Sequence, residues 1–180
     1  MAISSPRIKR WTRVEYERLV DLGAFLPGDR LELVGGHLLV REPQGGPHFT
    51  AVGLRQDGLG AAFGPGWRVR SQGPIALDDD SEPEPDIAVV RGSRRDHIRA
   101  HPSRPVLIVE VADWTLRFDR NAKASLYARA GIADYWVVNL VDQVLEVRRD
   151  PVAAPKARYG HRYSTTIVLR GGEHVTPLAA

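Results

Sequence analysis

Glu110 is a carboxylate inside the most hydrophobic segment of the chain, Val-Leu-Ile-Val-Glu-Val-Ala at residues 106–112. An ionised group that enters an apolar interior loses its hydration, so it is rarely buried without a partner. Glu110 therefore requires a nearby cation, either a basic side chain or a metal ion. The alternative is that Glu110 emerges at the end of a strand into solvent, with at most a surface salt bridge.

A second carboxylate, Asp86, follows a proline and opens the apolar segment at residues 87–90. Proline favours extended geometry and strand side chains alternate, so Asp86 is expected on the face shared with Ala88. The separation of 24 positions from Asp86 to Glu110 leaves room for one strand, a loop and a return strand. The two carboxylates can thus meet at neighbouring strand ends. Alternatively, Asp86 only ends the acidic run at residues 78–86.

Lys123 is one of three lysines in a chain whose Lys and Arg residues number 25. Leu126, Tyr127 and Ala130 follow it at the spacing of one helix face. Lys123 therefore lies on or beside the buried face. It could cover apolar surface with its aliphatic stem, or direct its ammonium at an anionic site.

Three helices are expected to position these residues. Thr12 and Glu15 have the spacing of a capping box, which predicts a helix that Gly23 can close. A second helix is predicted over residues 49–63. A third is predicted over residues 120–130, with Asp119 as its cap and Gly131 at its end.

The predicted strands alternate with these helices, which suggests a single mixed α/β domain over residues 1–180. Its core is expected at about residues 11–149, with further strands in residues 150–180. The glycine pair at residues 35–36 suits a hairpin turn. Strands are predicted at residues 31–34, 37–40, 67–71, 75–77, 87–90, 106–109, 135–140 and 144–148, with another pair near 167–172.

Composition limits the classes of function. The chain has no cysteine, which excludes disulfides and thiolate chemistry. No apolar stretch approaches the ~20 residues that a membrane span needs. Residues 1–11 are polar and basic without the apolar core of a secretory signal, so a cytoplasmic protein without membrane contact is expected.

Several segments together carry a resemblance to a known family. They are Glu-Pro-Asp-Ile-Ala-Val-Val at residues 84–90, Leu-Ile-Val-Glu-Val at 107–111, the run at 119–138, the hairpin at 30–38, and Pro47-His48. Over about residues 11–149 the chain resembles the Uma-type restriction endonuclease family of the PD-(D/E)XK nuclease superfamily. The resemblance implies a restriction-endonuclease-like core, a central mixed sheet flanked by helices.

The resemblance also implies a catalytic set. Asp86 and Glu110 match the two acids of the motif, and Glu32 matches a recurrent family acid. The lysine that usually follows two positions after the second acid is Ala112 here, and Lys123 on the next helix matches a migrated ammonium.

The implied reaction is Mg²⁺-dependent hydrolysis of phosphodiester bonds in DNA, with Mn²⁺ as a possible substitute and no organic cofactor. Asp86, Glu110 and the Val111 carbonyl would hold the metal, because Mg²⁺ prefers oxygen ligands. Lys123 would position or deprotonate the attacking water, or stabilise charge on phosphorus.

Binding of the DNA backbone is assigned to basic residues, and a homodimer is expected because nucleases of this superfamily commonly act as dimers. A basic loop after residue 90 is the candidate surface, although loop charges are often only solvated. The candidate DNA-binding residues are Arg91, Arg94, Arg95, Arg99 and His48.

Two alternatives stay open. The chain could be a catalytically inactive nucleic-acid-binding or regulatory protein on the same fold, or a metal-dependent hydrolase of a small phosphoester. The sequence also departs from the family's usual Leu-Ser-Pro-Ser-Thr at residues 112–115, where it has Ala-Asp-Trp-Thr, and His48 lacks the usual polar residue after it.

Overall fold

The centre of the molecule is a six-stranded sheet with the order β3-β4-β5-β6-β7-β8. The computed structural model describes residues 7–26 and 28–180. Most of residues 1–11, where no secretory signal is predicted, therefore lies outside the described part. β5 and β6 are parallel, and the other neighbours are antiparallel. The predicted mixed α/β fold is confirmed. The strands are β3 (Trp67–Ser71), β4 (Ile87–Arg91), β5 (Leu107–Ala112), β6 (Asp134–Asn139), β7 (Val144–Ala153) and β8 (His161–Leu169).

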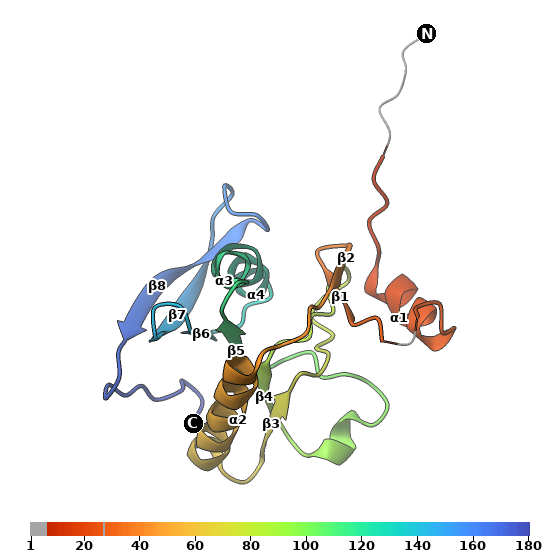
Figure 1. Ribbon diagram of the computed structural model, residues 1–180. Coiled ribbons are helices and arrows are strands. Elements are labelled where there is room, and N and C mark those ends of the chain that lie inside the picture. The colour runs from red at the N-terminus through yellow and green to blue at the C-terminus, as the bar shows by residue number, and fades with distance from the viewer. Residues whose placement is uncertain (1–6, 27) are drawn as a thin grey trace.

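Helices cover both faces of this sheet (Figure 1). α2 (Gly46–Phe63) packs on one face, where its apolar side chains meet Val109 and Val111. The other face is covered by a helical segment made of α3 (Leu116–Phe118), the π-helical turn η2 (Asp119–Lys123) and α4 (Ala124–Arg129). None of the helices in the described ranges is both long and apolar enough to cross a membrane.

The N-terminal part adds α1 (Arg13–Asp21) and a hairpin of β1 (Leu31–Val34) and β2 (His37–Val40). The predicted capping box of α1 is present, with both of its reciprocal hydrogen bonds. The hairpin turn uses two glycines with positive φ, at 56° and 78°. Leu33 of β1 bridges to Glu82, which ties the hairpin to the loop before β4.

Two of the predicted strands do not form. Residues 75–77 belong to no named strand, because their amides donate to loop carbonyls of Pro83, Pro102 and Ser81 instead of to a neighbouring strand. Residues 170–180 likewise contain no strand, and β8 instead pairs with an extended β7.

Two predicted element boundaries also shift. β5 continues to Ala112, so Glu110 lies inside the strand and not at its end. The third helix begins at Leu116, so Asp119 lies within the helical segment and is not its cap. The Thr115 hydroxyl donates a hydrogen bond to the buried Asp119 carboxylate at 2.6 Å and stabilises it there.

Glu82 is a buried carboxylate away from the sheet centre, in the loop that meets α1 and β1. Its Oε2 has no hydrogen-bond partner among the described residues. Burial raises the pKa of Glu82 to about 7, and the neighbouring carboxylates of Glu17 and Glu84 add to the shift. Arg13 opposes it. His101 Nε2 lies 3.8 Å from Glu82 Oε1.

Glu82→Gln should therefore stabilise the protein at alkaline pH. A carboxyl whose pKa is raised from 4.5 to about 7 contributes stability below its ordinary pKa and loses it as the pH rises through about 7. We expect the variant to gain a few degrees in Tm at about pH 8.5 and to match the wild type near pH 5. Thermal unfolding followed by circular dichroism measures this. Exposed Asp57→Asn serves as control, and no gain at alkaline pH would contradict the prediction.

Candidate active site

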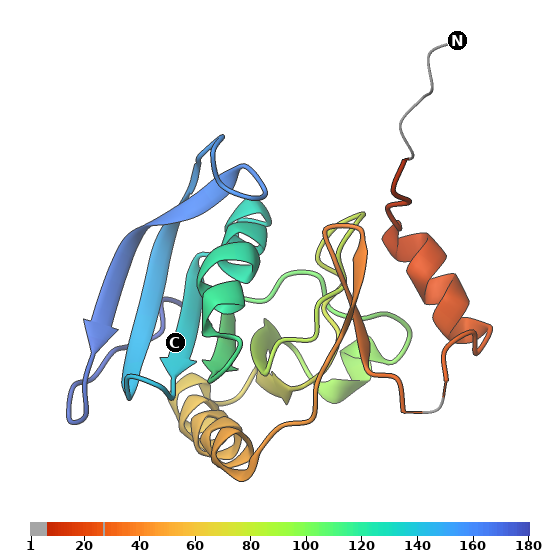
Figure 2. The same ribbon diagram turned by 45° about the horizontal axis from the view of Figure 1, so that its top comes forward.

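A pocket of about 940 Å³ lies between β2 and the α3–η2 segment. Its lining comes from the hairpin and from the helical segment, which face one another across a gap between the ribbons in Figure 2. The chain topology thus brings side chains from distant parts of the sequence to one place. Six of the predicted site residues line this pocket, namely Glu32, His48, Asp86, Glu110, Val111 and Lys123.

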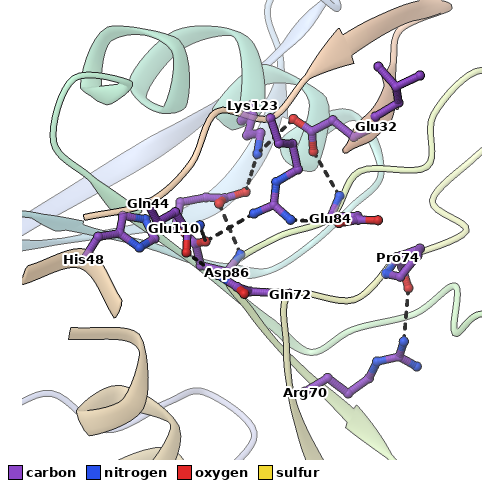
Figure 3. Close-up of polar contacts among 12 residues, drawn as sticks. Glu32, Gln44, His48, Arg70, Gln72, Pro74, Glu84, Asp86, Glu110 and Lys123 are labelled. Atoms are coloured by element: carbon purple, nitrogen blue, oxygen red, sulfur yellow. Dashed lines mark hydrogen bonds and ion pairs between the residues drawn. The ribbon is translucent and has the colours of Figure 1, made fainter. Parts of the chain in front are cut away.

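Glu110 lies at the floor of the pocket and is 3% exposed. Of the two alternatives for this residue, burial and exposure to solvent, the structure shows burial. Its Oε1 accepts hydrogen bonds from Lys123 Nζ at 3.0 Å and Tyr127 Oη at 2.7 Å. Its Oε2 accepts from the Asp86 amide at 3.3 Å (Figure 3). Burial raises the pKa of Glu110 above its ordinary value, with Lys123 opposing the shift and Asp86 adding to it.

Asp86 precedes β4 and its carboxylate receives four donors. Oδ2 accepts from the Val111 amide at 2.8 Å and lies 3.2 Å from His48 Nε2. Oδ1 accepts from Gln44 at 3.1 Å and from Arg41 at 3.4 Å. Burial alone would raise the pKa of Asp86, but the hydrogen bonds from His48 and the Val111 amide lower it below its ordinary value. Asp86 is therefore ionised at neutral pH.

Lys123 points its ammonium into the carboxylate cluster and does not merely cover apolar surface. Nζ lies 3.0 Å from Glu110 Oε1 and 3.4 Å from Glu32 Oε1. Burial alone would lower the pKa of Lys123, but Glu110 and then Glu32 hold it above its ordinary value. The side chain is therefore a fixed positive charge and a poor proton acceptor.

The π-helical turn η2 sets the direction of this lysine. It spans Asp119–Lys123 and joins directly to α4. π-Turns insert an extra residue into a helix and occur frequently at functional sites. Lys123, the last residue of this turn, and Tyr127 of α4 reach the same oxygen of Glu110.

Sequence reasoning missed four polar partners of the site. The sequence pattern places Tyr127 only on an apolar helix face, although its hydroxyl needs a partner when buried. Arg41 and Gln44 contact Asp86 from the segment between β2 and α2, and no local pattern marks them. Asp119 lines the pocket, and burial raises its pKa to about 6, with Lys123 opposing.

The predicted basic loop lies elsewhere. Arg91 ends β4 at the opposite end from Asp86, and its guanidinium lies 4.4 Å from the centre of the Trp67 ring. None of the four arginines Arg91, Arg94, Arg95 and Arg99 lines the pocket. Their role in binding DNA stays a prediction.

The donor set of the pocket fits a divalent cation. Four carboxylates are buried here, those of Glu32, Asp86, Glu110 and Asp119. Within the described ranges no three His, Asp or Glu side chains are arranged to hold one ion. Two carboxylates and a backbone carbonyl suffice for Mg²⁺, which usually keeps several waters. The Val111 amide donates to Asp86, and a strand residue directs its N–H and C=O to the same edge, so the Val111 carbonyl faces this side too.

Tyr127→Phe should destabilise the protein by about 1–3 kcal/mol, because it removes a donor from a buried carboxylate. Urea unfolding followed by circular dichroism measures the change. Tyr159→Phe is the matched control, since the Tyr159 hydroxyl makes no hydrogen bond within the described part of the chain. Equal stabilities of the two variants would argue against the contact.

Comparison with known proteins gives the family to which this fold and pocket belong. The chain shares its fold with the crystal structure of a putative nuclease of the DUF820 family from Anabaena variabilis, with a TM-score of 0.63 at 17% identity. That similarity covers 93% of this chain and 89% of the other. Residues 13–179 match the Uma2 family, described as "Putative restriction endonuclease", and the chain belongs to this family. The predicted family membership is confirmed. No curated protein matches the chain.

Proposed function

We propose that this protein is a metal-dependent endonuclease that hydrolyses phosphodiester bonds in DNA. Asp86, Glu110 and the Val111 carbonyl would hold Mg²⁺, or Mn²⁺ in its place. The observation that carries the proposal is the convergence of buried charges at one pocket floor. Lys123 Nζ lies 3.0 Å from Glu110, and Glu110 in turn accepts from the Asp86 amide at 3.3 Å.

When bound, the metal would neutralise phosphate charge and make a water more acidic. Lys123 would place a fixed ammonium beside the negative charge that develops on phosphorus. Because its pKa is held high, we assign it this electrostatic role and not that of a general base.

The remaining polar residues position this set. Glu32 is the second carboxylate beside Lys123 Nζ, at 3.4 Å, and the Glu84 amide orients Glu32 by donating to Oε2 at 3.0 Å. His48 orients Asp86 from α2 at 3.2 Å. These contacts fix the acids and the ammonium before a substrate arrives, which lowers the cost of reorganisation during the reaction.

The proposal includes a homodimer acting on DNA in the cytoplasm, so that two sites can reach both strands. The arginines after β4 would contact the backbone away from the cleavage site. Such contacts make binding depend on salt, and each neutralised phosphate contributes a slope of about −0.9 on a logarithmic scale.

Plasmid nicking tests the proposed activity. Purified protein with Mg²⁺ or Mn²⁺ should convert supercoiled plasmid to nicked and then linear forms, and chelation with EDTA should stop the conversion. Cleavage that continues in EDTA would contradict the metal dependence. Binding of DNA by folded, metal-loaded protein without any cleavage would instead favour an inactive nucleic-acid-binding protein on the same fold.

A further inference from the structure

The rim of the pocket carries an exposed aromatic side chain. Trp114 lines the pocket and is 66% exposed, whereas Trp136 is buried in the core. Trp114 lies in the turn before α3, where its amide donates to Asp113 Oδ1 at 2.5 Å. A tryptophan held at the entrance to a polar pocket leaves a large flat apolar surface available to a ligand.

Two arginines stand on the same rim without acidic partners. Arg117 belongs to α3, and Arg158 belongs to the connection between β7 and β8. Both line the pocket and both are exposed. Neither forms an ion pair within residues 7–26 and 28–180, whereas Arg129 is paired with Asp78 and Asp80. Their charges are therefore available to an anion.

The pocket thus combines an acidic floor with a rim that carries Trp114, Arg117 and Arg158 beside the exposed Glu42. A nucleic-acid strand has phosphates that arginines bind and bases that stack on aromatic rings. In a duplex the faces of each base are covered by its neighbours, so only an unpaired base offers its face to a side chain.

We propose that Trp114, Arg117 and Arg158 form a binding site for single-stranded nucleic acid, in which Trp114 stacks on an unpaired base and the arginines hold flanking phosphates. This inference rests on the proposed function for the cleavage step at the pocket floor. Binding at the rim does not require cleavage. The substrate would then be a single strand, or a duplex whose base is unpaired beside the bond to be cut.

Binding in EDTA separates this site from the nuclease activity. Fluorescence anisotropy would compare a labelled single strand of about twelve nucleotides with its duplex and with an abasic strand of equal length, at about 50 mM salt. We expect the single strand to bind at least about tenfold more tightly than the duplex. Equal affinity for the single strand and the duplex, or no binding to any probe, would overturn the proposal.

The variants test each part of the site. Trp114→Ala should weaken single-strand binding by about tenfold or more, leave the abasic strand unchanged, and be largely rescued by Trp114→Phe. The double variant Arg117→Gln, Arg158→Gln should weaken all probes and reduce the salt slope by about 1.4. Arg162→Gln, an exposed arginine of β8, is the matched control. Unchanged single-strand binding in Trp114→Ala would overturn the stacking role even if nicking is observed. Failure to nick with these binding results intact would overturn only the proposed function.

Discussion

Glu110→Gln should reduce metal-dependent nicking by about 100- to 1,000-fold while the protein stays folded. The amide keeps an oxygen that can accept from Lys123 and Tyr127, so the hydrogen bonds to Oε1 can persist. It lacks the negative charge that a divalent cation needs. Initial rates of plasmid nicking at saturating Mg²⁺ measure the loss, with circular dichroism as a check on folding.

The matched control for this change is Glu173→Gln, an exposed glutamate near the C-terminus. Its nicking rate should equal that of the wild type. If Glu110→Gln kept a rate within about tenfold of the wild type, Glu110 could not be the metal-holding acid, because loss of such a group costs more than this.

Lys123→Met should have the second large effect, on both stability and activity. It would leave the buried carboxylates of Glu110 and Glu32 without their shared cation, which costs about 3–5 kcal/mol. Nicking should fall by about 100-fold or more because the fixed positive charge beside the phosphate is lost. Urea unfolding and nicking rates measure the two losses separately.

Lys123→Arg distinguishes charge from shape at this position. It keeps the positive charge, so stability should be partly restored, but the planar guanidinium cannot take the place of a compact ammonium between two carboxylates. Its nicking rate should therefore stay low. Exposed Lys156→Met, from the β7–β8 connection, should leave both properties unchanged. A Lys123→Met protein as stable and active as the wild type would refute the proposed role.

Local sequence patterns were sufficient for much of the fold. The glycine pair of the first hairpin, the capping box of α1 and the apolar strands each carry their signal within a few residues. The pairing of Asp86 with Glu110 followed from the same logic, because alternation and a short return connection limit where two strand ends can lie. The sequence alone allowed Glu110 to be either buried or exposed. The structure shows why it is buried, because β5 continues past Glu110 to Ala112.

The rest depended on contacts between distant segments. Residues 75–77 have strand-like composition, but loop carbonyls take their amides, so tertiary contacts override the local preference. Asp119 is a residue type typical of helix N-caps. The helical segment begins at Leu116, however, so Asp119 lies buried inside it, beside Thr115. Arg41 and Gln44 reach Asp86 from more than 40 positions away, at separations of 45 and 42 residues.

The most direct measurement of the central claim is anomalous diffraction from crystals soaked in Mn²⁺. We predict an anomalous peak between the carboxylates of Asp86 and Glu110, on the side of the Val111 carbonyl, and no peak there in Asp86→Asn crystals. Contradiction would come from crystals with no peak at this position under Mn²⁺ concentrations that support nicking, or with a peak that persists unchanged in the variant.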